Sequence, residues 1–229
     1  SDLEARKGGF QISLDGDVAI KPTFTGTKVI ENFPLEELLP DSDWTPFFPT
    51  WELRGSYPKI FNDEYVGTEA KKLFDDAQVL LNKVVKEKLL QASGVIGFWP
   101  ANSVGDDIEL YTDESRKQLL TRIHTLRQQS EKVKGEPYYA LSDFIAPKES
   151  GIADYWGCFA VTAGIGCDEL VAEFEKDHDD YNSIMAKALA DRLAEAFAEK
   201  MHELVRREYW GYAKEEQLGA EELIKEQYQ

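Results

Sequence analysis

The sequence is poor in the residues that build several classes of protein. Only two of its 229 residues are cysteine, Cys158 and Cys167, and only three are histidine. Two cysteines are too few for a secreted scaffold held by disulfides, and these two lack the close spacing of a zinc site. We therefore expect two buried thiols in a reducing compartment and predict a cytoplasmic protein. No apolar run approaches the roughly 20 residues that cross a bilayer, and the first residues lack a signal pattern, so no membrane contact is expected.

Positive charge is also scarce. Lysine and arginine number 26 against 43 aspartate and glutamate, which gives a net charge of −17. Clustered cations are what neutralise nucleic-acid phosphates and anionic lipid surfaces, so both partners are excluded as general ligands. The remaining composition, with 42% hydrophobic and 30% charged residues, is that of a globular protein.

The chain shows no internal repeat, which excludes solenoids and propellers. Its first stretch mixes glycine, aspartate, lysine and short apolar pairs without a helical period. We interpret residues 1–28 as an extended lead-in and predict a domain over residues 29–229.

Two long amphipathic helices are predicted. Apolar residues recur every three or four positions after Thr68, a plausible N-cap, and Gly94 is the expected stop. The longest helix is predicted from Asp179 to about Tyr209, and its core stripe consists of Met185, Leu189, Leu193, Phe197 and Leu204.

Strands are predicted between these helices. Residues 95–99 and 155–162 have the composition of buried strands, and 108–111 alternates like a strand with one buried face. Residues 118–126 fit either a helix or a strand, and we favour a hairpin partner. Strands in the middle and helices at both ends indicate an α+β fold around an antiparallel or mixed sheet.

The second helix carries a further stripe beside its core face. Asp191 and Glu195 lie one turn apart between Ala188 and Ala198. Two carboxylates at this spacing repel each other weakly unless a cation compensates. The stripe is therefore either a solvated acidic face with Arg192 or Lys187 nearby, or a surface that faces a cationic ligand.

Asp43 precedes Thr45 and Pro46, which is the pattern of a helix N-cap. The aromatic residues around it, Trp44, Phe47, Phe48 and Trp51, fit a core or the wall of a pocket.

Other polar patterns give no metal, catalytic or phosphate site. His178, Asp179 and Asp180 fit the start of a helix better than a metal site, because no further histidine is placed to complete one. Neither glycine-rich phosphate motif is present.

Five segments in one order nevertheless resemble a known family, the C-terminal activation domain of cobalamin-dependent methionine synthase. The resemblance covers residues 33–229. The segments are D-W-T-P-F-F at 43–48, G-F-W-P-A-N at 97–102 with D-D-I at 106–108, L-R-Q-Q at 126–129, D-F-I-A-P-K at 143–148 with S-G at 150–151, and H-D-D-Y at 178–181 followed by K-A-L-A-D-R-L-A-E-A-F at 187–197.

The resemblance implies a role in reactivation. The family's enzyme moves a methyl group from methyltetrahydrofolate to homocysteine through cobalamin, and its activation domain binds S-adenosylmethionine. With an electron from flavodoxin or a flavoprotein reductase, it supports remethylation of oxidised cob(II)alamin. The resemblance assigns S-adenosylmethionine binding to Asp43 and Glu195 and a contact with the cobalamin domain to Asp191, and it assigns no catalytic residue. The ligand's sulfonium and ammonium groups suit two carboxylates.

The family's sequence continues beyond residues 222–229 into a G-I-R-P-A-P-G-Y-P segment whose Arg and Tyr hold the ligand. The given sequence stops before that segment, so we expect it to be an incomplete domain that binds S-adenosylmethionine weakly and is inactive in isolation. A second reading is an interaction fragment that docks the cobalamin domain or the reductase without binding ligand. The cobalamin signature D-x-H-x-x-G is absent, so cobalamin and zinc are assigned to other domains of the enzyme.

An acidic reductant needs local cations, and two groups qualify. Arg206 and Arg207 lie at the end of the second helix, and Lys71, Lys72 and Lys83 lie on the polar side of the first.

Overall fold

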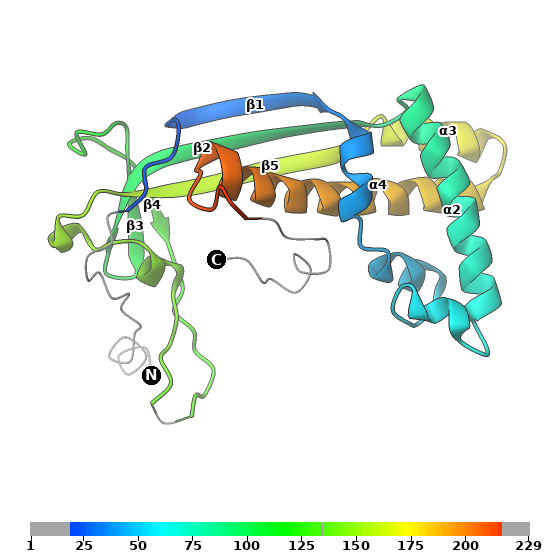
Figure 1. The fold of residues 1–229 in the computed structure, drawn as a ribbon, viewed down its shortest axis with the longest axis horizontal. Helices are drawn as coiled ribbons and strands as arrows, with labels where there is room; N and C mark the ends of the chain where they lie inside the picture. The colour runs from blue at the N-terminus through cyan, green and yellow to red at the C-terminus, as the bar shows by residue number, and fades with distance from the viewer. Residues whose placement is uncertain (1–18, 134, 217–229) are drawn as a thin grey trace. The chain divides into compact units, whose positions relative to one another are not determined.

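The structure is a computed structural model that describes residues 19–133 and 135–216 (Figure 1). The α-helices are α2 (Gly67–Glu87), α3 (Cys167–Lys176) and α4 (Asp180–Leu204). The strands are β1 (Gly26–Phe33), β2 (Gln91–Val104), β3 (Asp107–Tyr111), β4 (Leu119–His124) and β5 (Asp154–Ile165). The α+β class predicted from the sequence is confirmed.

The strands form one sheet of order β1-β2-β3-β4, in which β5 also pairs with β2. The β2–β3 and β3–β4 pairs are antiparallel, with Ser103 opposite Ile108 and Ile108 opposite Ile123. The segment at 118–126 is thus the hairpin partner that the sequence favoured. Strand β3 does not alternate as predicted, because Glu109 is as buried as its apolar neighbours.

The described residues fall into two compact units. The first holds residues 96–158 with 19–28 and 208–212, and its core forms around Ala101, Ile108 and Leu110. Trp99, Ile123, Ile145 and Trp156 pack against that core.

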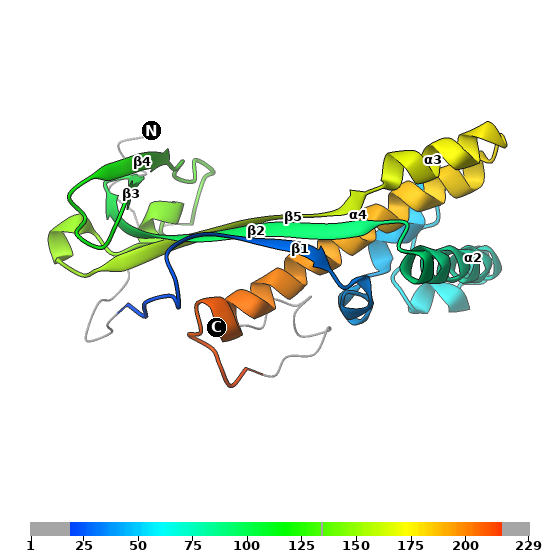
Figure 2. The ribbon, with the colours of Figure 1, turned by 90° about the horizontal axis from the view of Figure 1, so that it is seen from above.

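The second unit holds residues 29–95, 159–207 and 213–216. Helix α3 lies against α4 after a short turn (Figure 2), and α2 also contacts α4. The predicted core stripe of α4 is buried from Met185 to Phe197, whereas Leu204 is half-buried. Asp179 caps this helix as expected, because its Oδ1 accepts a hydrogen bond from the Asn182 backbone N at 3.0 Å.

Several element boundaries differ from the prediction. The N-cap residue of α2 is Val66 rather than Thr68, and its C-cap residue is Lys88, in the left-handed conformation. The predicted stop, Gly94, lies inside β2. Helix α3 was not predicted. Strand β1 begins at Gly26, before the predicted start of the domain at residue 29, and residues 1–18 of the predicted lead-in lie outside the described residues. The boundary at 28/29 stays a prediction.

Candidate functional site

Asp43 lies in the second unit, between two short 3-10 helices, η2 (Leu39–Asp41) and η3 (Thr45–Trp51). It is half-buried, and its Oδ1 accepts a hydrogen bond from the Thr45 backbone N at 2.9 Å. The N-cap residue of η3 is Trp44, which is one position later than the sequence predicted. Asp43 therefore fixes the turn that enters η3 rather than capping the helix itself.

The aromatic residues beside Asp43 are mostly core. Trp44, Phe47 and Phe48 are buried, and the Trp44 ring lies 4.9 Å from the ring of Phe74 on α2. Their packing fixes the backbone that follows Asp43. Trp51 is only half-buried and borders a cavity.

Asp191 and Glu195 lie on the exposed side of α4. The Asp191 carboxylate pairs with Arg192 at 2.6 Å, as the solvated-face interpretation expects. Within the described residues, Glu195 takes part in no hydrogen bond or ion pair. Because η2 and η3 both contact α4 (Figure 1), the segment that carries Asp43 packs on the helix that carries Glu195. The structure thus places the three predicted residues on neighbouring elements of one unit.

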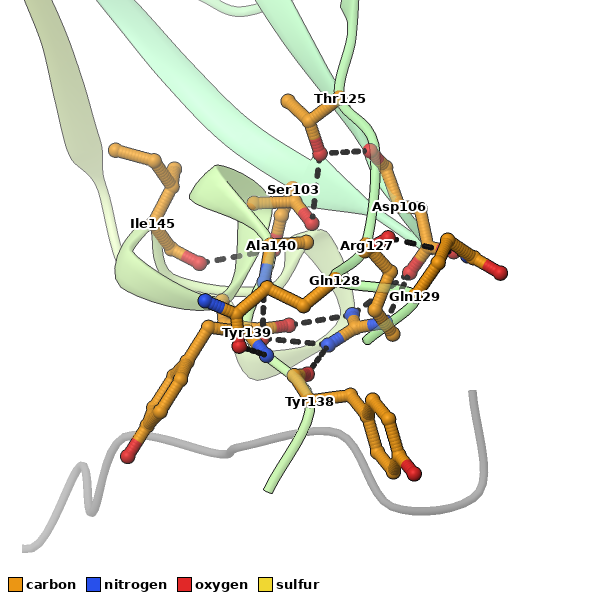
Figure 3. Close-up of polar contacts among 12 residues, drawn as sticks. Ser103, Asp106, Thr125, Arg127, Gln128, Gln129, Tyr138, Tyr139, Ala140 and Ile145 are labelled. Carbon is orange, nitrogen blue, oxygen red and sulfur yellow. Dashed lines mark hydrogen bonds and ion pairs between the residues drawn. The ribbon is translucent and has the colours of Figure 1, made fainter. Parts of the chain in front are cut away.

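In the first unit, three of the segments that carry the resemblance meet around the buried side chain of Arg127 (Figure 3). They are residues 106–108, 126–129 and 143–148. Its guanidinium contacts Asp106 at 2.7 Å and both carboxylate oxygens of Asp143 at 2.6 Å. It also donates to the backbone oxygen of Tyr138. The hydrogen bonds to Asp143 contribute most to raising the pKa of Arg127. These residues join three separate segments, which gives them a structural role.

A second ionic cluster surrounds Glu109 on β3. Lys148 lies 2.8 Å from Oε2 and Arg122 lies 2.6 Å from Oε1, while the Tyr111 hydroxyl donates to Oε2 at 3.0 Å. The hydrogen bond from Lys148, followed by that from Arg122, lowers the pKa of Glu109 to about 2. Sequence reasoning missed this cluster. Its signal was a glutamate at the centre of an apolar strand, which only paired cations can compensate.

The segment G-F-W-P-A-N ends in a third polar anchor. The Asn102 side chain donates to the backbone oxygens of Ala146 and Ile152 and accepts from Arg116 at 2.8 Å. Arg116 also donates to the backbone oxygen of Asp154. The residues that carry the resemblance in this unit therefore hold loops to strands.

The structure removes Arg206 from the two groups of cations that were predicted to receive an acidic reductant. Arg206 is buried, and its Nε lies 2.7 Å from Glu216, so it is no surface cation. Arg207 is exposed and pairs with Glu203. Lys71, Lys72 and Lys83 are exposed on α2, as predicted, and Lys71 pairs with Asp75.

The thiols also differ from the expectation of two buried cysteines. Cys158 is exposed and Cys167 is half-buried, where burial raises the pKa of its thiol. Among residues 19–133 and 135–216, no group of three or more metal-ligating side chains is gathered. In the same part of the chain, no helix combines the length and the apolarity that a membrane crossing requires.

A cavity of about 490 Å³ lies in the second unit, between η3, α2 and the start of α4. Asp43, Asp191 and Glu195 do not line it. Sequence reasoning had offered Trp51 among the aromatic residues that fit a core or the wall of a pocket. It did not predict the rest of the lining, because the walls come from three separated segments.

Comparison with known proteins gives two findings. The family model for the activation domain of vitamin B12 dependent methionine synthase matches residues 34–229. A crystal structure of the MetH reactivation domain bound to AdoHcy is 52% identical and has a TM-score of 0.94. That match covers 99% of this chain and 69% of the other.

Proposed function

This chain belongs to the family of activation domains of vitamin B12 dependent methionine synthase, and we propose that it binds S-adenosylmethionine for the reductive remethylation of cob(II)alamin. The observation that carries the proposal is the 52% identical reactivation domain bound to AdoHcy. AdoHcy is S-adenosylmethionine without the transferred methyl group and without the sulfonium charge. The domain thus serves a methyltransferase by returning its oxidised cofactor to the cycle.

Asp43 supports the proposal by its geometry. One carboxylate oxygen is engaged by the Thr45 backbone N, which orients the group before any ligand arrives. The other oxygen, Oδ2, makes no hydrogen bond within the described residues. The buried rings of Trp44 and Phe47 pack against each other and hold the backbone that follows Asp43. An oriented, half-buried carboxylate is suited to an ammonium or sulfonium group.

Glu195 supplies the second negative charge. It is exposed on α4, the helix against which η2 and η3 pack. Solvent weakens an exposed ion pair to about 1 kcal/mol or less, whereas a partly buried pair retains more of its Coulomb energy. We therefore assign the larger share of the recognition of the cationic ligand to Asp43.

Asp191 lies one turn before Glu195 and is the candidate contact with the cobalamin domain. Its side chain keeps 66% of its surface exposed although it pairs with Arg192. An exposed charge of this kind suits the rim of an interface between domains. The electron donor, flavodoxin or a flavoprotein reductase, is the second proposed partner.

The proposal is tested by titrating S-adenosylmethionine and AdoHcy into the ¹⁵N-labelled chain and following amide shifts by NMR, which also detects weak binding. Asp43→Asn should weaken S-adenosylmethionine binding about tenfold and Glu195→Gln about threefold, because each substitution removes one negative charge of the protein that would face the cationic ligand. Substitution of the carboxylate that faces the sulfonium should weaken the binding of S-adenosylmethionine more than the binding of AdoHcy.

The matched control is Asp168→Asn, because Asp168 is an exposed carboxylate at the start of α3. This variant should leave both titrations unchanged. Asp191→Asn should retain ligand binding and weaken association with a separately prepared cobalamin domain. Equal affinities of the unsubstituted chain, Asp43→Asn and Glu195→Gln would contradict the assigned residues. Docking of the cobalamin domain without any ligand shifts would support the interaction-only alternative.

A further inference from the structure

The cavity between η3, α2 and the start of α4 has aromatic rings and carboxylates in its lining. We propose that it binds an organic cation with an alkylated ammonium head. All of its lining residues belong to the second unit, and neither Asp43 nor Glu195 is among them. The inference therefore stands independently of the proposed binding of S-adenosylmethionine.

Three aromatic side chains border the cavity: Trp51, Tyr65 and Tyr181. The rings of Trp51 and Tyr181 lie 6.2 Å apart. Tyr65 is 89% exposed, yet its backbone is fixed, because Asp63 Oδ1 accepts hydrogen bonds from the backbone N of Tyr65 at 2.8 Å and of Val66 at 3.0 Å. Aromatic faces carry negative electrostatic potential and attract alkylated ammonium groups.

Two carboxylates of α2 complete the lining. Glu69 and Asp76 are seven residues apart, which places them two turns apart on one side of the helix. The Tyr181 hydroxyl donates to Asp76 Oδ2 at 2.9 Å. Burial, followed by this hydrogen bond, raises the pKa of Tyr181 to about 12, so the hydroxyl stays a donor at neutral pH. The hydrogen bond orients the Asp76 carboxylate beside the rings.

Size and charge select the class of ligand. A volume of about 490 Å³ lies in the usual range of small-molecule sites, about 300–1,000 Å³. Such a space, walled by rings, suits an organic ligand better than a bare metal ion. One lysine, Lys72, also lines the cavity, but it is exposed and opposes two carboxylates and three rings. The balance favours a cation over an anion, and Lys72 should weaken its binding.

The test uses choline and its neutral isostere 3,3-dimethyl-1-butanol as probes. The two compounds have the same shape and differ in charge, so only a cation site separates them. Each is titrated into the ¹⁵N-labelled chain, and the Trp51 indole signal, assigned with Trp51→Phe, is followed by NMR. We expect choline to shift this signal and to bind at least about fivefold more tightly than the alcohol.

Variants at exposed or half-buried positions keep the core intact. Tyr65→Ala and Asp76→Asn should each weaken choline binding several-fold, whereas Lys72→Gln should strengthen it. Asp75→Asn removes an equal charge from the position just before Asp76. Asp75 lies outside the lining, so this variant should not change choline binding. Asp43→Asn should also leave choline binding unchanged, which separates this site from the proposed ligand site.

Three results would overturn the proposal. They are equal binding of choline and the neutral alcohol, the absence of a Trp51 shift with choline, and equal effects of Asp75→Asn and Asp76→Asn.

Discussion

At the scale of single residues, the first unit is held by charged side chains inside or at the edge of its core. Glu109 and Arg127 are 6% and 7% exposed, and each is surrounded by partners of opposite charge. A buried charge that loses its partner retains the cost of its desolvation. These residues should therefore tolerate substitution poorly although they are not assigned to any ligand.

Glu109→Gln tests this role through its dependence on pH. We expect the free energy of unfolding to fall by about 2 kcal/mol at pH 7, because the substitution removes a carboxylate that accepts hydrogen bonds from Lys148 and Arg122. The native pKa of about 2 lies below the ordinary glutamate value of 4.5. The stabilisation is therefore full above pH 4.5 and is lost as the pH falls towards 2.

Urea unfolding of the unsubstituted chain and of Glu109→Gln at pH 7, 4 and 3 measures this difference. The two chains should converge as the pH falls. Glu87→Gln, at the exposed end of α2, is the control and should differ little from the unsubstituted chain at every pH. A gap between the chains that stays constant from pH 7 to pH 3 would contradict the ionic explanation.

At the scale of elements, the strongest periodic patterns predicted the structure best. The stripes of α2 and α4 are long enough to specify helices without tertiary information, and the run at 95–99 is the centre of β2. Ends were predicted less well. Helix α2 ends because Lys88 adopts the left-handed conformation, and a lysine at that position does not indicate a helix end in the sequence.

The candidate site also has a part that the sequence predicts and a part that depends on tertiary packing. Asp191 and Glu195 share a face because helical geometry requires it, so the sequence alone places them together. The packing of the Asp43 segment on α4 depends on η2 and η3, which join positions about 150 residues apart. Only the resemblance linked Asp43 with Glu195 beforehand. The ring of carboxylates and aromatic side chains around the cavity had no such guide.

The start of α3 gives a testable case of tertiary control over an element. Gly166 is the N-cap residue, with φ of 92°, and a Cβ there would lie 2.5 Å from the backbone oxygen of Leu89. Gly166→Ala should therefore lower the free energy of unfolding by about 1–3 kcal/mol, through backbone strain and the close contact.

Gly105→Ala is the matched comparison, because Gly105 also has positive φ, 61°, but has open space around its Cβ position. Thermal or urea unfolding should show a smaller loss for Gly105→Ala than for Gly166→Ala. Equal losses would mean that the contact with Leu89 contributes nothing and that backbone strain alone matters.

At the scale of the whole chain, the charge of −17 conflicts with the proposed acidic reductant. Flavodoxins are generally acidic, so the two proteins should repel each other at long range unless cations are gathered locally. Because Arg206 is buried against Glu216, the exposed lysines of α2 are the better surface. Lys71 pairs with Asp75, while Lys83 has no ion-pair partner within the described residues.

Reversing charge at Lys83 tests whether α2 receives the reductant. Lys83→Glu should slow association with flavodoxin severalfold at low ionic strength, measured by stopped-flow mixing with the enzyme that contains this domain. The difference should fade towards 1 M salt, where the screening length shortens to about 3 Å. Lys176→Glu, an equal reversal at the end of α3, is the control and should change the rate less. If both reversals slow association equally, total charge rather than α2 governs the encounter; if neither does, electron delivery takes place on another domain.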